Sequence, residues 1–148
     1  MPKVLITGMS GTGKSSVVRR LGERGHRAVD TDYGDWSHRV DDEWIWREDA
    51  IAGLLDEEGS VFVAGCMSNQ VRFYPRFDHV VLLSAPAEVM LARIEARTGN
   101  PYGKSPGERQ AILDDLAEIE PLLRQSASLE IDTRAPLDEV VRRLERLM

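Results

Sequence analysis

The residues best suited to chemistry lie in a glycine-rich stretch near the N-terminus. Residues 8–15 read GMSGTGKS and fit the pattern G-x-x-x-x-G-K-[ST] throughout. Glycines at these positions let backbone N–H groups turn inward around phosphate oxygens, and a helix that follows adds the positive end of its dipole. Lys14 can reach the β- and γ-phosphates, and the Ser15 hydroxyl can ligate Mg²⁺. The alternative is a glycine-rich turn without a function. The predicted buried strand before the stretch and the predicted helix after it favour a phosphate-binding loop instead.

A second group of candidates follows the next apolar run. Residues 28–37 read AVDTDYGDWS, so Asp30 and Asp32 lie at the end of a short predicted strand. A carboxylate near a triphosphate can order water around Mg²⁺ or accept the proton of a hydroxyl group. Because the two residues are two apart on an extended segment, their side chains should point the same way. The alternative is a structural turn or a helix N-cap, which Asp also favours.

Alternating strands and helices are predicted to position these candidates. Short, almost wholly apolar runs are typical of strands buried in a parallel sheet, and they occupy residues 3–7, 26–30, 60–65, 77–84 and 129–133. Pro86 suits a first helical turn, and Ser105 with Glu108 forms a capping box. Helices are predicted over residues 14–24, 42–58, 85–98, about 106–125 and 136–147.

The alternation predicts an α/β fold in which a five-stranded parallel sheet carries helices on both faces, with right-handed crossovers. We expect one domain over residues 1–148. In such a sheet the ligand site lies at the carboxyl ends of the strands, where both the glycine-rich stretch and Asp30 fall. Residues 99–107 are rich in Gly and Pro, which predicts a mobile loop.

Composition excludes several classes of function. The chain has 148 residues and a net charge of −6, without a basic tract that would favour nucleic-acid binding. Cys66 is the only cysteine and the histidines are scattered, so neither an internal disulfide nor a zinc-type site is expected. No run approaches the ~20 apolar residues of a membrane span. The sequence predicts a cytoplasmic monomer or homodimer without membrane or nucleic-acid partners.

The position of the carboxylates indicates what happens to the γ-phosphate. The third and fourth predicted strands end in AGC and LLSA, without the terminal Asp of a usual Walker B motif. The carboxylates follow the second strand instead, as in small-molecule kinases. We therefore expect transfer of the γ-phosphoryl group of MgATP to a small acceptor. A nucleoside or nucleotide kinase, and an ATP-binding or ATPase module without kinase activity, remain the alternatives.

The whole chain resembles the small P-loop kinases, a family that includes shikimate kinase, gluconate kinase and the nucleoside monophosphate kinases. The phosphate loop, the Asp30-Thr31-Asp32 segment and the later WRED carry the resemblance. It implies a three-layer P-loop NTPase fold with strand order 2-3-1-4-5. It also implies that Asp30 helps to hold Mg²⁺ through water, and that Asp32 contacts the acceptor hydroxyl and is placed as its base.

The resemblance further implies an acceptor-binding helical region at about residues 33–58, in which Arg47 binds an acidic group of the acceptor. On a helix, Arg47 would share a face with Trp44 and Ile51 and so lie near the cleft. A surface pair with Glu43 is the alternative. Asn69, after the third strand, is a candidate for the acceptor pocket, and an ordinary helix start is its alternative.

Near the nucleotide, the resemblance implies a lid at about residues 97–107. Arg93 and Arg97 precede it, where such arginines stack on adenine or touch γ-phosphate oxygens, and a solvated helix face is the alternative. Arg134 and Pro136 follow the fifth strand, where relatives frame the adenine.

Two departures from the shikimate kinases concern the acceptor. Those enzymes have Arg-x-Pro-Leu after the lid, whereas residues 119–122 read IEPL, so Ile119 replaces an arginine that grips a carboxylate. Their third strand ends in three glycines, and this one ends in Gly65-Cys66-Met67. Shikimate is therefore not expected to be a good substrate, because an unpaired buried carboxylate is costly.

The expected site residues form four groups. The catalytic candidates are Lys14, Asp32 and Arg97, the acceptor candidates are Asp32, Arg47 and Asn69, and the Mg²⁺ candidates are Ser15 and Asp30. The nucleotide is expected to contact Gly8, Gly11, Thr12, Gly13, Lys14, Ser15, Ser16, Arg93, Arg134 and Pro136.

Overall fold

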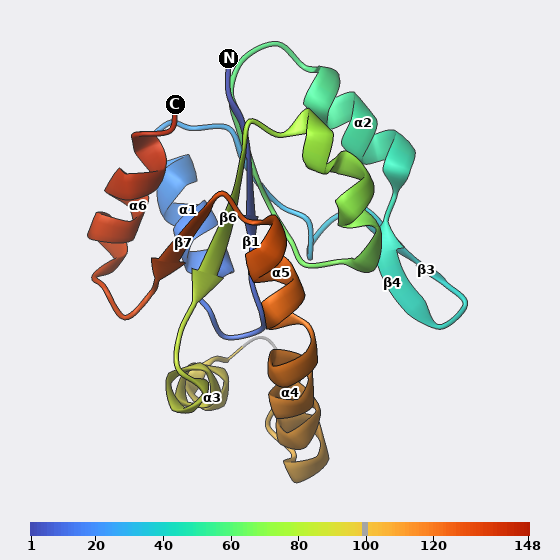
Figure 1. Cartoon of the computed structure of the whole chain (residues 1–148), viewed down its shortest axis with the longest axis vertical. Helices are drawn as coiled ribbons and strands as arrows, with labels where there is room; N and C mark the ends of the chain where they lie inside the picture. Colours follow the sequence, from blue (N-terminus) through green and yellow to red (C-terminus); the bar gives the residue numbers. More distant parts are fainter. Residues whose placement is uncertain (99–100) are drawn as a thin grey trace.

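A five-stranded parallel sheet forms the centre of the molecule (Figure 1). The computed structural model describes residues 1–98 and 101–148. The sheet has the order β2-β5-β1-β6-β7, which in chain order is the predicted 2-3-1-4-5. Ile6 of the central strand is in register with Ala64 on one side and Val81 on the other. The strands of this sheet are β1 (Lys3–Thr7), β2 (Ala28–Asp30), β5 (Val61–Ala64), β6 (His79–Ser84) and β7 (Leu129–Asp132), with β1 at the centre.

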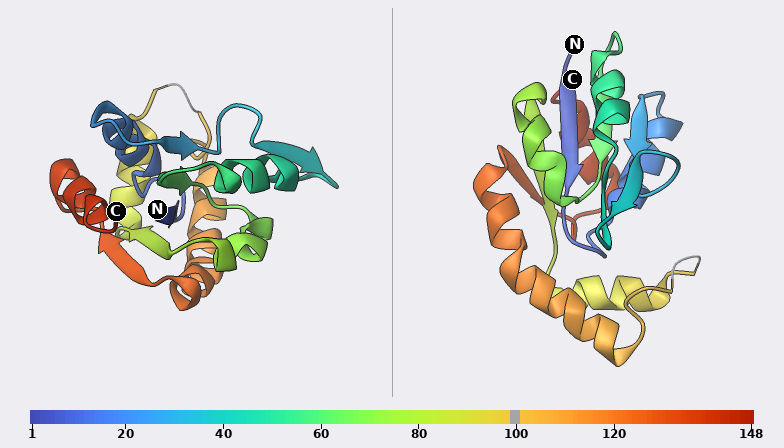
Figure 2. Two further views of the ribbon diagram at one scale, coloured as in Figure 1. Left: turned by 90° about the horizontal axis from the view of Figure 1, so that it is seen from above. Right: turned by 90° about the vertical axis from the view of Figure 1, so that its right-hand side faces the viewer.

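Helical segments cover both faces of the sheet (Figure 2). Alternation along β1 sends Val4 and Ile6 to one face, where they pack with helices α1 (Lys14–Glu23) and α6 (Leu137–Glu145). Leu5 faces the other side and packs with α2 (Glu48–Asp56) and the 3₁₀ helix η1 (Ser68–Arg76). Two apolar layers therefore hold the sheet rigid, so its carboxyl edge is a fixed platform for a site.

A third apolar cluster lies at that carboxyl edge. Met9, Leu82 and Met90 contribute to it, and they connect the phosphate loop, β6 and α3 (Ala87–Ala96). Helices α4 (Pro106–Glu118) and α5 (Glu120–Ser126) return the chain to β7. Figures 1 and 2 show α3 and α4 beyond the ends of the strands, so both helices face the predicted ligand edge.

The predicted helix over residues 42–58 is wrong in its first third. A two-stranded antiparallel hairpin is present instead, with β3 (Ser37–Val40) and β4 (Glu43–Trp46), and α2 begins only at Glu48. The turn residues Asp41 and Asp42 both have positive φ, 51° and 64°. That conformation suits a two-residue hairpin turn and ends any helix there. Trp44 is consequently 58% exposed, whereas Trp46 is fully buried.

The helix predicted over residues 106–125 is two helices. Pro121 lies in the first turn of α5, where its missing N–H costs nothing, but it cannot continue a helix from α4 without losing a hydrogen bond. One half of the predicted capping box is present, since Ser105 Oγ accepts a hydrogen bond from the backbone N–H of Glu108. The Glu108 carboxylate accepts from the backbone N–H of Gly103 and from the Ser105 hydroxyl, rather than from the backbone N–H of Ser105 as a full capping box requires. Over the described part of the chain, no helix has both the length and the apolar character needed to cross a membrane.

Candidate active site

The phosphate loop connects β1 to α1 and passes close to neighbouring backbone. A Cβ at Gly8 would lie 2.5 Å from the carbonyl oxygen of Leu83, and one at Gly11 would lie 2.7 Å from that of Met90. Gly11 also has a φ of 84°, which other residues rarely adopt. Glycine is therefore required at both positions, because a side chain would collide with the backbone of β6 or α3.

Two side chains at the start of α1 point back to the loop or across to β2. Lys14 Nζ donates hydrogen bonds to the carbonyl oxygens of Gly8 and Met9, at 2.6 and 3.0 Å. Ser15 Oγ donates to Asp30 Oδ2 at 2.7 Å. The two Mg²⁺ candidates, Ser15 and Asp30, are thus in direct contact between the start of α1 and the end of β2, and their role in binding a metal stays a prediction.

Thr31 fixes the segment that carries the two aspartates. Its buried hydroxyl donates to the carbonyl oxygen of Ala64 at 2.7 Å and accepts from Trp46 Nε1 at 2.8 Å. Asp30 Oδ1 accepts from the backbone N–H of Asp32 at 3.1 Å. The side chain of Thr31 is therefore anchored in the core, while the aspartates on either side reach the carboxyl edge of the sheet.

Asp32 has a perturbed pKa. Its carboxylate is open to solvent on one side but lies in a recess, and the loss of water around it raises its pKa above the ordinary Asp value. The nearby negative charge of Asp30 raises the pKa further, and the ammonium of Lys14 opposes both effects. A carboxylate of this kind is a better proton acceptor than an ordinary exposed Asp.

Two cavities meet at the phosphate loop. The larger has a volume of about 1150 Å³ and extends from residues 10–17 along α3 to the segment after β7. The smaller has a volume of about 220 Å³ and extends from residues 8–10 toward α4. Ser10, Lys14 and Asp32 line both cavities. A group bound at this junction would be within reach of ligands in either cavity.

Arginines line the larger cavity. The guanidinium of Arg93 donates to the hydroxyl and carbonyl oxygens of Thr133, at 2.8 and 2.6 Å, and so links α3 to the end of β7. Arg97 donates to the carbonyl oxygen of Tyr102 at 2.6 Å. Arg134 also lines this cavity, and its guanidinium is paired with Asp132 at 2.6 Å. Pro136 is not among the lining residues, although Ala135 and Leu137 are.

The structure does not bring Arg47 and Asn69 to either cavity. Arg47 is exposed and immediately precedes α2, because the residues before it form β4 rather than a helix. Asn69 accepts from the backbone N–H of Trp46 and donates to its carbonyl oxygen, both at 2.9 Å. Asn69 therefore ties η1 to the hairpin, as expected for the structural alternative.

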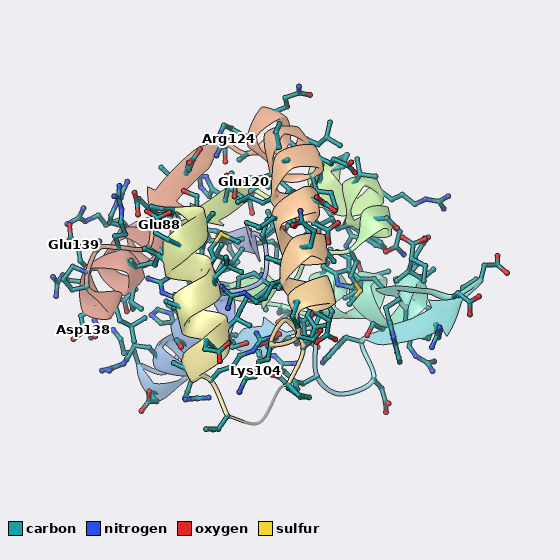
Figure 3. The ribbon with its side chains drawn as sticks, turned by 90° about the horizontal axis from the view of Figure 1, so that it is seen from below. Glu88, Lys104, Glu120, Arg124, Asp138 and Glu139 are labelled. Carbon is teal, nitrogen blue, oxygen red and sulfur yellow. The ribbon has the colours of Figure 1, made fainter. Side chains whose placement is uncertain are left out.

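The predicted lid at about residues 97–107 is described in part, and residues 99 and 100 lie outside the described residues. Figure 3 views this end of the molecule, with Lys104 on the segment between α3 and α4. Lys104 Nζ donates to the carbonyl oxygen of Arg97 at 2.6 Å. Gly103 is buried, and a Cβ there would lie 2.8 Å from Ile94 and 2.6 Å from Ile112. This part of the segment is packed between the two helices. Its role as a lid stays a prediction.

Most of the residues that line the smaller cavity were not predicted from the sequence as site residues. The side of this cavity opposite the phosphate loop is formed by Cys66, Tyr102, Ile112, Asp115 and Ile119. Spacings of three and four residues place Ile112, Asp115 and Ile119 on one face of a helix. That pattern was readable in the sequence, but it does not distinguish a helix face that packs in the core from one that lines a cavity.

A parallel sheet of this order, with a complete phosphate loop after its central strand, defines a P-loop nucleoside triphosphate-binding protein. A family model described as "AAA domain" matches residues 4–119, and the chain belongs to that family.

The relatives of the chain are kinases within the class of P-loop nucleoside triphosphate-binding proteins. The chain is 29% identical over 151 residues to the "Putative adenylate kinase" of Archaeoglobus fulgidus, covering 98% of this chain and 81% of that protein. It is 25% identical over 150 residues to the shikimate kinase of Psychrobacter arcticus, with coverage of 90% and 81%. The solved shikimate kinase from Acinetobacter baumannii, in complex with shikimate, has a TM-score of 0.73 at 20% identity, covering 99% and 92% of the two chains. These findings confirm the resemblance to the small P-loop kinases and support a phosphotransferase.

Proposed function

We propose that the protein is a kinase that transfers the γ-phosphoryl group of ATP to a hydroxyl group of a small acceptor. The observation that carries this proposal is the junction of the two cavities, where Ser10, Lys14 and Asp32 face both. ATP occupies the larger cavity and the acceptor occupies the smaller one. The γ-phosphate then lies at the junction, next to the hydroxyl that receives it. Such positioning supplies much of the catalysis in phosphoryl transfer.

The residues of the larger cavity suit a triphosphate. The glycine-lined loop and the start of α1 present N–H groups and a positive dipole end to phosphate oxygens. On ATP binding, Lys14 exchanges its loop carbonyls for phosphate oxygens. Arg97 reaches the γ-phosphate, while Arg93 and Arg134 border the nucleotide at the end of β7.

The site also fits Mg²⁺. Ser15 and Asp30 present two oxygen atoms 2.7 Å apart at the start of α1, and oxygen ligands are those that Mg²⁺ prefers. Among the described residues, no group of three or more His, Cys, Asp or Glu side chains could hold a metal. Mg²⁺ at nucleotide sites usually keeps several waters and is bound by one or two protein oxygens together with substrate phosphates. Mg²⁺ neutralises the charge that develops on the phosphates.

Asp32 binds the acceptor hydroxyl and accepts its proton. The predicted lid, about residues 97–107, excludes water that would otherwise act as the acceptor. Arg47 and Asn69 have no part in this proposal, because they line neither cavity. A cytoplasmic location and a monomeric or homodimeric state stay predictions from the sequence.

Two rival functions are testable against this one. The adenylate kinase relative favours a nucleotide as the acceptor, and the AAA domain match is compatible with an ATPase that phosphorylates nothing. ADP release measured with and without a panel of hydroxyl compounds and nucleotides separates the three. A kinase is stimulated by one class of compound, whereas an ATPase module shows the same rate throughout.

Substitution of Asp32 supplies the decisive comparison. Asp32→Asn keeps a hydrogen-bonding side chain but cannot take a proton, so acceptor-dependent turnover should fall by roughly 10²–10⁴-fold. Nucleotide affinity should stay almost unchanged, whereas Lys14→Ala should abolish nearly all transfer. Asp35→Asn, in the same segment and exposed, is the matched control. Near-full acceptor phosphorylation by Asp32→Asn would remove Asp32 from the reaction.

A further inference from the structure

The size and charge of the smaller cavity indicate what kind of acceptor it can bind. This inference rests on the function proposed above. Apart from the phosphate loop, this cavity is lined by apolar and acidic residues: Asp32, Cys66, Tyr102, Ile112, Asp115 and Ile119. A volume of about 220 Å³ is below the ~300–1,000 Å³ of typical drug-sized ligand sites. The acceptor is therefore small.

The charged groups of this wall are acidic. Asp32 and Asp115 are both carboxylates, and Lys14 is the one cation among the described residues that line the cavity. Lys14 belongs to the phosphate loop, where its ammonium already contacts loop carbonyls. No Arg or His is present among the described lining residues. An acceptor with a carboxylate or a phosphate would thus meet two negative charges and no cation of its own.

Asp115 is placed to bind a ligand. It lies on α4 between Ile112 and Ile119, which face the same cavity, and its side chain is half-buried. Within the described part of the chain, the carboxylate of Asp115 has no hydrogen-bond or ion-pair partner. Its neighbour Asp114, in contrast, accepts a hydrogen bond from Gln110. A half-buried carboxylate between two isoleucines gains most from a cation that donates a charge-assisted hydrogen bond.

We propose that the acceptor is a small compound that carries both a hydroxyl and an ammonium group. Asp115 binds the ammonium group, and Asp32 holds the hydroxyl. In the transfer, the hydroxyl oxygen bonds to the γ-phosphorus, the bond from that phosphorus to the bridging oxygen breaks, and ADP leaves while the proton passes to Asp32. A neutral polyol fits the volume but leaves Asp115 without a counter-charge. An acid or a nucleoside monophosphate adds like charge to the wall.

Matched compounds test this assignment. We would use two series that share a carbon skeleton and differ in charge: 3-amino-1,2-propanediol, glycerol and glycerate, and glucosamine, glucose and gluconate. Binding to the MgADP complex is measured by calorimetry, and transfer is measured as ADP release. The amine of a series should bind and react best. Asp115→Asn should weaken its binding at least tenfold and change the neutral compound little, while Asp114→Asn is the control.

Each outcome decides the question. Preference for the acid or the neutral member of a series, with ADP release intact, would overturn this inference and leave the proposed function standing. An amine that binds through Asp115 without any acceptor-dependent ADP release would uphold the ammonium site and overturn the proposed function. Equal binding of the amine by the wild type and by Asp115→Asn would overturn the assignment of Asp115. Failure of both amines to bind would overturn this inference, while the proposed function would still be decided by ADP release with the wider panel of hydroxyl compounds and nucleotides.

Discussion

A single buried threonine holds the acidic segment of the candidate site. Asp30 and Asp32 differ in their surroundings because Thr31, between them, is fixed in the core by Ala64 and Trp46. Asp30 is held by Ser15, whereas Asp32 faces both cavities. The positions of both carboxylates thus depend on a hydroxyl group that is buried in the core and lines neither cavity.

Removal of that hydroxyl should cost stability. Thr31→Val has nearly the same shape but leaves Trp46 Nε1 without a partner inside the core, whereas the carbonyl of Ala64 keeps the backbone N–H of residue 31 at 2.9 Å. The free energy of unfolding should fall by about 1–3 kcal/mol, which is the cost of leaving a buried polar group unpaired. Denaturant unfolding measures this change. Thr31→Ser is the matched control because it keeps the hydroxyl and loses only the methyl group. A loss in Thr31→Val no larger than that in Thr31→Ser would contradict a dominant contribution of the hydrogen bonds.

The pKa of Asp32 should depend on the charges of its neighbours Asp30 and Lys14. Burial raises its pKa first, and the charge of Asp30 adds to that effect while Lys14 opposes it. In Asp30→Asn the charge is removed, so the pKa of Asp32 should move down toward the ordinary Asp value. The acid limb of the acceptor-dependent rate in wild type should lie above that value, because the base works only when ionised. Carboxyl ¹³C NMR titration measures the pKa of Asp32 in the wild type and in Asp30→Asn, and the pH dependence of ADP release gives the acid limb. A higher pKa of Asp32 in Asp30→Asn than in the wild type would contradict the charge effect.

At the scale of elements, sequence patterns predict the strands, helices and loops whose conformation is determined by neighbouring residues in the chain. The five sheet strands were readable as short apolar runs, and the loop and its helix were readable from GMSGTGKS. The hairpin was missed because Trp44, Ile51 and Leu55 also fit a helical spacing, and burial of Trp46 against Thr31 decided the outcome. Asp41-Asp42 was a weak signal, since Asp tolerates positive φ less readily than the usual glycine. The wall of the smaller cavity depends on how α4 docks, which no local pattern determines.

Helix α6 offers an element-scale test with a defined pH dependence. Glu145 accepts hydrogen bonds from Arg24 and contacts His26 at 2.7 Å, and these partners lower its pKa from 4.5 to about 2. A lowered carboxyl pKa stabilises the fold above the unfolded value and loses that contribution as the pH falls through the folded value. The wild type should therefore lose more stability than Glu145→Gln between about pH 4.5 and 2.

Unfolding by denaturant at a series of pH values provides the measurement. Other carboxylates titrate in both proteins, so the quantity of interest is the difference between wild type and Glu145→Gln, which should shrink as the pH falls. Glu139→Gln, exposed on the same helix, should follow the wild type. A difference that stays constant with pH would show that the carboxylate of Glu145 contributes no charge-dependent stability.

At the scale of the whole molecule, the sheet with its two helical layers forms one side of the candidate site, and α3 and α4 form the other side (Figure 2). Lys14 and Asp32, two of the catalytic candidates, come from the first side through the phosphate loop and the segment after β2. Arg97, the third, comes from the end of α3 on the other side. The groups proposed for chemistry therefore come from both sides, and they can act together only when the two sides enclose both ligands.

The contact between Arg97 and Tyr102 has a thermodynamic consequence. Arg97 lines the larger cavity, Tyr102 lines the smaller one, and the guanidinium of the first donates to the carbonyl of the second. A nucleotide that repositions Arg97 therefore also repositions a wall of the neighbouring cavity, and the reverse holds by thermodynamic linkage. The binding of the two substrates should therefore be coupled. Each should change the dissociation constant of the other by the same factor, and calorimetric titration of either ligand with and without the other measures that factor.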